Sequence, residues 1–211
     1  LVNTAFPLKK PIYEPKIYLN FSENKYDKIS SLNKPIIMFG ILGSTPQKSM
    51  PSKYIVELID YLTANYKLYI LFNYAPHQKE EAAKIYKACK DKEAIMFNIY
   101  ENSIRGFIKL MNKCRLLISN EGGAVHIAKA LKKPTFTIFS PYVLKSHWAS
   151  FEDGIFHDSI HLLDSQPKLF ATDKNTRKKI EEEPNEIYKK LTPKIIIIKL
   201  KLFLKNNFLN G

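Results

Sequence analysis

The sequence predicts an α/β domain in which helices cover both faces of a parallel sheet, in a Rossmann-like, three-layer arrangement. From residue 35 onward, short apolar runs alternate with segments of helical length. The runs are continuously apolar rather than alternating with polar residues, which is typical of parallel strands buried on both faces. The chain has 211 residues, 45% of them hydrophobic, which is enough for one ordinary domain with extensions.

Each strand is predicted by a short apolar run, and each helix by apolar residues at intervals of three and four. The predicted strands are 36–39, 68–72, 94–97, 116–118 and 135–139. The run 94–97 is the weakest of them. The predicted helices are 54–62, 78–89, 103–113 and 124–131. Ser52 is placed to cap the first helix. Parallel strands joined by helices form right-handed βαβ units, which bind ligands at the carboxyl ends of the strands.

The chain divides into three segments by composition. Residues 1–33 contain several prolines and are predicted to be an interdomain connector or the remnant of a preceding domain. Residues 34–165 form the predicted Rossmann-like domain, and 166–211 a polar loop followed by a basic amphipathic helix. Within this last segment, 195–208 alternates aliphatic residues with lysines as a strand would. Its length and lack of Gly or Pro favour a helix that packs on the domain over one that lies on a membrane.

The net charge of +13 points to anionic partners. Only three of the 33 basic residues are Arg, so lysines produce a diffuse positive field rather than bidentate phosphate sites. Such a field suits a nucleotide, a phosphorylated glycolipid or an anionic inner-membrane surface, although lysines also serve solubility alone. No zinc-finger spacing, helix-turn-helix pattern or RNA-binding aromatic motif is present, so no nucleic-acid partner is predicted.

Cysteine and histidine usage predicts a cytoplasmic protein without a metal. Two cysteines, Cys89 and Cys114, do not make a disulfide framework in a chain of this length, which favours a reducing compartment. The histidines lack a metal-ligand pattern. No apolar stretch resembles a secretion signal or approaches the length of a membrane span.

The segment Asn120-Glu121-Gly122-Gly123-Ala124-Val125-His126 lies where a predicted strand ends and a helix begins. Two glycines permit close approach of a ligand, and the free N–H groups of the helix's first turn favour an anion such as a diphosphate. Glu121 would repel phosphate and is better suited to a hydroxyl group. His126 could donate a hydrogen bond to phosphate. The segment could equally be a tight structural turn in which Glu121 stabilises the helix N-terminus.

Two further loops follow the first two predicted strands. Gly43-Ser44-Thr45-Pro46-Gln47-Lys48 combines a flexible glycine, hydroxyls for phosphate oxygens and an ammonium for a diphosphate leaving group. It is not a Walker motif, because Gly-Lys-Ser/Thr is missing, and it could be an ordinary polar loop. Ala75-Pro76-His77-Gln78 follows the second strand and could line the same pocket.

These three loops, in this order, resemble those of glycosyltransferase family 9, the heptosyltransferases of lipopolysaccharide core assembly. The similarity covers roughly residues 35–141 and is most specific in 118–134. There the family pattern Asn-Asp-Ser/Thr-Gly-Pro-x-His-x-Ala-x-Ala-x-x-x-Pro is similar to the segment from Asn120 to Pro134. Lys48-Ser49-Met50-Pro51 is similar to the family's Lys-x-Trp-Pro.

The resemblance implies the C-terminal, donor-binding half of a GT-B enzyme with two Rossmann-like domains. Family members transfer a sugar, usually heptose from ADP-heptose, to a lipid-linked saccharide acceptor with inversion and without a metal or other cofactor. The implied donor-binding residues are Gly43, Ser44, Thr45, Lys48, Gln78, Asn102, Glu121, Gly122, Gly123 and His126. The catalytic base of the family lies in the N-terminal domain, so no catalytic residue is predicted here.

The chain departs from the family pattern at several of these positions. Glu121 replaces the usual Asp, Gly122 replaces a hydroxyl residue, and Gln78 stands where some members have an acidic ribose ligand. These departures leave open a second hypothesis, in which the chain is a non-catalytic module that binds a nucleotide sugar or docks on a membrane or partner.

Overall fold

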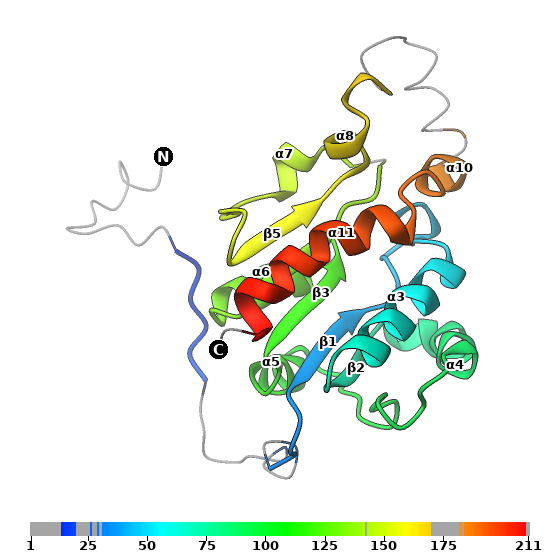
Figure 1. Ribbon diagram of the computed structural model, residues 1–211. Coiled ribbons are helices and arrows are strands. Elements are labelled where there is room, and N and C mark those ends of the chain that lie inside the picture. Colours follow the sequence, from blue (N-terminus) through cyan, green and yellow to red (C-terminus); the bar gives the residue numbers. More distant parts are fainter. Residues whose placement is uncertain are drawn as a thin grey trace, which may run out of the picture.

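The computed structural model describes residues 14–19, 26, 29, 31–141, 143–169, 182 and 184–209. Much of the predicted connector and of the polar loop after residue 166 lies outside these residues. The described chain contains a five-stranded, fully parallel sheet in the order β2-β1-β3-β4-β5 (Figure 1). Its strands are β1 (Ile36–Gly40), β2 (Tyr69–Asn73), β3 (Leu116–Asn120), β4 (Thr135–Ile138) and β5 (His157–Ile160).

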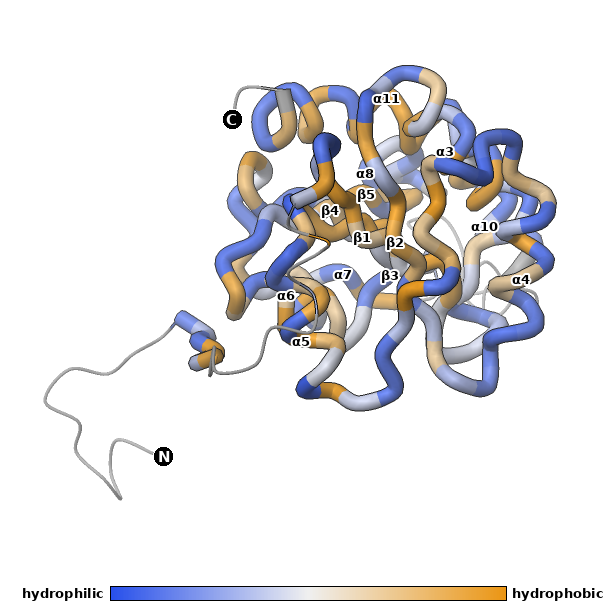
Figure 2. Tube along the Cα trace, turned by 90° about the horizontal axis from the view of Figure 1, so that it is seen from below, coloured by the Kyte–Doolittle hydropathy of each residue, from blue (hydrophilic) through white to orange (hydrophobic). Residues whose placement is uncertain are grey.

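Helices cover both faces of the sheet, as Figure 2 shows along the strands. One face carries α3 (Ser52–Asn65), α4 (Lys79–Ala88) and α11 (Pro193–Leu204), and the other carries α5 (Ile104–Asn112) and α6 (Gly123–Ala130). The shorter helical segments are η1 (Pro46–Lys48), η2 (Pro76–Gln78), α7 (Lys145–Trp148), α8 (Leu162–Ser165), η3 (Pro167–Leu169), α10 (Pro184–Tyr188) and η4 (Lys205–Leu209).

Strand β1 shows why the apolar runs identified strands. Ile37 and Phe39 belong to the core cluster under α3 and α11, whereas Ile36 and Met38 belong to the cluster under α5 and α6. Successive side chains of a strand point to opposite faces, so a strand covered on both sides needs apolar residues at every position. The predicted three-layer α/β fold is therefore confirmed.

Two local predictions are wrong. Ser52 does not cap α3, because the helix begins at this residue and its hydroxyl donates to Oε1 of Glu81 at 3.1 Å. The segment 94–97 is not a strand. It makes a single bridge, between Ile95 and Ile70, and then turns, since the Phe97 N–H bonds back to the Ile95 carbonyl at 2.9 Å. By contrast, α5 has a side-chain cap, in which the Ser103 hydroxyl accepts from the Gly106 N–H at 3.0 Å.

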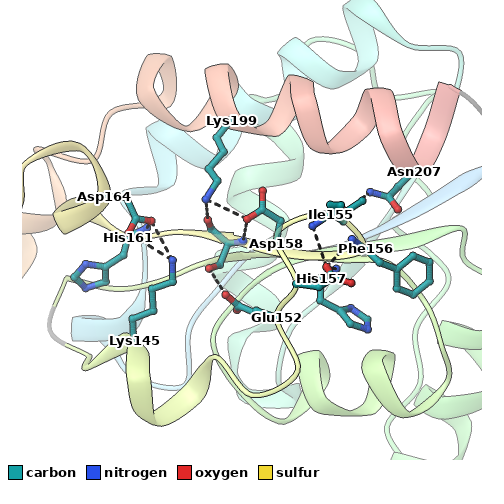
Figure 3. A network of polar contacts seen from close by, with 12 residues as sticks. Lys145, Glu152, Ile155, Phe156, His157, Asp158, His161, Asp164, Lys199 and Asn207 are labelled. Atoms are coloured by element: carbon teal, nitrogen blue, oxygen red, sulfur yellow. Dashed lines mark hydrogen bonds and ion pairs between the residues drawn. The ribbon is translucent and has the colours of Figure 1, made fainter. Parts of the chain in front are cut away.

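The C-terminal segment forms helix α11, as predicted, and it packs on the same core as the sheet. Its inner side buries aliphatic and aromatic residues, namely Ile196, Leu200, Phe203 and Leu204. Figure 3 shows that Lys199 of α11 pairs with Asp158 of β5, at 3.1 Å. In η4, which follows α11, the Asn207 amide donates to the carbonyl of Ile155, just before β5, at 2.7 Å. No helix among the described residues is long and apolar enough to span a membrane.

Candidate functional site

The strand order changes direction between β1 and β3. The chain leaves β1 for β2 on one side and returns to β3 on the other, so the loops after β1 and β3 diverge and leave a crevice. A cavity of about 550 Å³ occupies this place. It is lined by the loops that follow β1, β2 and β3, together with residues 100–107 and Trp148.

The structure brings most of the predicted site residues together. Eight of the ten line this cavity: Gly43, Ser44, Lys48, Gln78, Asn102, Glu121, Gly122 and Gly123. Thr45 lies beside a neighbouring cavity of about 400 Å³ that shares Ser44 with the first. His126 does not line either cavity, and its ring lies 6.2 Å from that of Trp148. Binding of a ligand by these residues remains a prediction.

The β1 loop is tightly folded around Gly43. Its N–H donates to the Ser49 hydroxyl at 3.0 Å, and that hydroxyl donates to the Thr45 carbonyl at 2.9 Å. A Cβ at position 43 would lie 2.3 Å from the Lys48 carbonyl oxygen, so this approach of two backbone segments requires glycine. The result is a compact turn that carries Lys48 on η1 at the edge of the cavity.

Asn120 fixes this turn from the end of β3. Its side-chain amide donates to the Lys48 carbonyl at 2.9 Å and to the Tyr188 hydroxyl at 2.8 Å. The Ser140 hydroxyl, at the end of β4, donates to the Gln47 carbonyl at 2.9 Å. The sequence motif placed Asn120 at the site but did not reveal this role, because its partners come from distant parts of the chain.

Glu121 lies at the floor of the cavity and is only 6% exposed. Its Oε2 accepts from the Ser140 N–H at 3.0 Å, whereas Oε1 has no hydrogen-bond partner. Burial raises the pKa of this carboxyl, although the backbone hydrogen bonds and the charge of Lys48 oppose the shift. A buried acceptor without a partner is suited to a ligand hydroxyl.

The two glycines leave the start of α6 open. Gly122 has a φ of +153°, and nothing lies within 4 Å of where a Cβ would stand at Gly122 or Gly123. The N–H groups of the first helical turn have no partners within the helix and favour negative charge. A phosphate group could therefore approach this backbone closely.

A basic and aromatic cluster lies at one wall of the cavity. The Lys48 ammonium is 5.0 Å from the centroid of the Trp148 ring, and the centroid of the His126 ring is 6.2 Å from that of the same indole. Burial, followed by the charge of Lys129, lowers the pKa of His126, which favours the neutral imidazole. Trp148 was missed by the sequence prediction, because α7 occupies a segment that reads as a loop.

Gln78 is engaged by the protein itself. Its Nε2 donates to the Gly43 carbonyl at 2.7 Å, and its Oε1 accepts from the Ala75 N–H at 2.8 Å. It thereby joins the loops after β1 and β2, a role that its place in the sequence did not indicate.

A flat aromatic wall stands near Asn102. The rings of Tyr74 and Tyr100 stack at 4.6 Å, and the Tyr100 hydroxyl donates to the Tyr74 carbonyl at 2.8 Å. Both residues line the cavity. Among the residues that the structure describes, no group of three or more His, Cys, Asp or Glu side chains could hold a metal ion.

The fold, with its cavity at the switch point of the sheet, is that of one Rossmann-like half of a GT-B glycosyltransferase. The family model of glycosyltransferase family 9 (heptosyltransferase) matches residues 1–149. The chain therefore belongs to this family.

Solved structures with the same fold support the assignment. ADP-heptose lipopolysaccharide heptosyltransferase II of Escherichia coli superposes with a TM-score of 0.60 and 17% identity over 92% of this chain and 56% of its own. A family 9 glycosyltransferase from Veillonella parvula gives 0.57 and 17% over 85% and 49%. E. coli heptosyltransferase WaaC with ADP-2-deoxy-2-fluoro heptose gives 0.53 and 17% over 82% and 44%. The chain thus spans about half the length of these structures. A comparison with curated proteins finds no match.

Proposed function

We propose that this chain supplies the donor-binding half of a heptosyltransferase-type enzyme. Such an enzyme would transfer a sugar, with inversion, from a nucleoside diphosphate sugar to a lipid-linked saccharide acceptor. ADP-heptose is the leading candidate for the donor. The observation that carries the proposal is the cavity in which Lys48, the open start of α6 and the buried Glu121 converge. The E. coli relative crystallised with an ADP-heptose analogue makes this donor class the first to test.

Each part of the cavity suits one part of such a donor. The Lys48 ammonium and the N–H groups of α6 would hold the diphosphate and stabilise the charge that develops as it leaves. The free Oε1 of Glu121 would accept from a sugar hydroxyl, and the wall of Tyr74 and Tyr100 would lie beside the base. In this proposal Lys48 supplies the positive charge at the leaving group, and no metal takes part. The base that deprotonates the acceptor would come from outside this chain.

The single tryptophan of the chain provides a direct test. Because Trp148 lines the cavity, ADP should change its fluorescence when excited at a wavelength selective for indole. Titration with ADP is expected to give a saturable change, and titration with adenosine a weaker response, since adenosine cannot reach Lys48. A flat signal with ADP, confirmed by calorimetry that detects no heat of binding, would contradict the proposed function.

A non-catalytic nucleotide-sugar-binding module is the second candidate. It is favoured by Glu121, whose Oε2 is already held by the Ser140 N–H, and by the lack of a side chain at Gly122. Both candidates bind the donor, so only turnover separates them. In a protein that also carries the acceptor-binding half, release of ADP from ADP-heptose in the presence of an acceptor would support the enzyme, and binding without release would support the module.

The outer side of α11 suits the anionic surface of the inner membrane, from the cytoplasmic side. Ile198 and Leu202 are both 62% exposed and stand one turn apart. Exposed lysines flank them at positions 194, 201 and 205. Aliphatic residues surrounded by lysines favour contact with anionic lipid.

Substitution of both aliphatic residues, Ile198→Ser with Leu202→Ser, is expected to weaken binding to vesicles that contain anionic lipid about tenfold, because most of the apolar contact is lost. Cosedimentation with anionic and with neutral vesicles measures this effect. Ile155→Ser is the matched control, since Ile155 is 61% exposed but lies outside α11. Equal binding of the double variant and the wild-type chain would rule out this surface.

A further inference from the structure

We propose that Trp148 is a positioning residue of the donor site, whose indole face holds the Lys48 ammonium at the cavity wall, where the ammonium can bind an anionic diphosphate. This inference rests on the proposed function and adds to it a residue that no family motif indicated. The contact between Lys48 and Trp148 carries it.

The geometry is that of a cation–π interaction. The Lys48 Nζ lies 5.0 Å from the centroid of the Trp148 ring, within the roughly 6 Å over which an ammonium is attracted by an aromatic face. Trp148 lines the same cavity as Lys48, so the contact occurs inside the site. The His126 ring, at 6.2 Å, is tilted by 32° against the indole and packs on it from α6.

The backbones that carry the two partners are each fixed independently. Asn120 holds the Lys48 carbonyl at 2.9 Å. Helix α7, which carries Trp148, is attached to α8 by an ion pair of 3.2 Å between Lys145 and Asp164 (Figure 3). Between these two supports, the flexible part is the four-carbon stem of Lys48. A lysine side chain loses rotamer entropy when it is fixed, so a prior contact that restricts it favours later binding.

The contact with the indole also keeps the Lys48 ammonium from forming an ion pair with Glu121. Glu121 is a buried carboxylate with an unpartnered Oε1. Burial raises its pKa and the charge of Lys48 opposes this shift, so the two groups are close enough to interact. A direct ion pair would neutralise both groups and remove the free positive charge from the cavity. An aromatic face attracts the ammonium without neutralising it. Because the ammonium has further N–H groups that do not face the ring, a phosphate can bind it while the indole still holds it in place.

Calorimetry on the full chain with ADP and with adenosine tests the role of Trp148. Trp148→Ala is expected to weaken ADP binding about fivefold, since exposed cation–π contacts contribute on this scale. Adenosine lacks the phosphates and should bind the variant as it binds the wild-type chain. Trp148→Phe retains an aromatic face and should recover most of the affinity. His147→Ala, an exposed aromatic neighbour on α7, is the control and should have no effect.

A double-mutant cycle separates positioning from simple packing. In a chain that already carries Lys48→Met, Trp148→Ala should no longer affect ADP affinity, because the group that it positions is gone. Equal ADP affinity of Trp148→Ala and wild-type protein would overturn the inference. Two other results would also overturn it: an equal loss of affinity for adenosine in Trp148→Ala, or an undiminished effect of Trp148→Ala on ADP affinity in the Lys48→Met chain. Either result would show that Trp148 only lines the cavity. If the wild-type chain binds no ADP, both this inference and the proposed function fail.

Discussion

Gly43→Ala is expected to destabilise the domain and to abolish measurable ADP binding. The added Cβ would lie 2.3 Å from the Lys48 carbonyl oxygen and 2.4 Å from its carbon, both backbone atoms. Asn120 holds that carbonyl in place, so the loop cannot simply shift. Forcing an extra methyl group into a packed site typically costs about 1–3 kcal/mol of the free energy of unfolding. The loop that relaxes to accept it would carry Lys48 out of the cavity.

Urea denaturation and calorimetry with ADP measure the two parts of this effect. Gly123→Ala is the matched control for stability, because nothing lies within 4 Å of a Cβ there and alanine is favoured over glycine within a helix. The control should unfold at the same urea concentration as the wild-type chain or at a slightly higher one. A Gly43→Ala protein that binds ADP normally would show that the turn does not place Lys48.

Glu121→Gln is expected to stabilise the chain while it removes selectivity for the sugar. The amide oxygen of Gln could still accept from the Ser140 N–H, and the buried charge would be gone. We expect the free energy of unfolding at pH 7 to rise by about 1 kcal/mol, as is common when a functional group at an unfavourable position is replaced. When a ligand hydroxyl loses the charged group that accepts its hydrogen bond, the affinity for the ligand falls by about tenfold or more. ADP-heptose should therefore lose its advantage over ADP, whereas ADP itself should bind at least as well.

The pH dependence of stability follows from the raised pKa of Glu121. Between the pKa of an unfolded Glu and the higher pKa in the folded chain, the folded state binds more protons than the unfolded state. The free energy of unfolding therefore falls as pH rises through this interval, and the penalty is fully present above it. The Gln variant should lack this decline. Urea midpoints of both proteins from pH 4 to pH 8 measure it, and parallel profiles would contradict the assignment.

The sequence predicted the parts of the fold that depend on local patterns. The runs in β1, β2 and β3 are apolar at most positions because helices cover both faces, and β4 alternates threonine with apolar residues. Strand β5 was missed, since His157-Asp158-Ser159-Ile160 has one aliphatic residue. It forms because tertiary contacts satisfy its polar groups, including the pairing of Asp158 with Lys199. Residues 94–97 have the opposite character, with an apolar composition but a single bridge to the sheet.

The site was predicted as a set of loops rather than as a set of contacts. Parallel strands place the loops after β1 and β3 at the same edge of the sheet, on either side of one crevice. Lys48, Glu121, Gly122 and Gly123 could therefore be assigned to one cavity. The supports of that cavity come from far along the chain. Asn120 bonds to Tyr188, 68 residues away, and Ser140 bonds to Gln47, 93 residues away. Such pairings depend on how the layers pack, which the spacing of residues within a motif does not encode.

The bond between Asn120 and the buried Tyr188 has a consequence for the order in which the domain is made. The family motifs end before residue 150, yet the turn that carries Lys48 is held through Asn120 by a residue of α10. On the ribosome, β1, β3 and the loop of Gly122 and Gly123 emerge well before Tyr188, but a domain generally folds as a unit. The nascent chain should therefore acquire its affinity for nucleotide only after α10 and α11 have emerged and docked on the core that they share with the sheet. A nucleotide would then bind completed chains in preference to nascent ones.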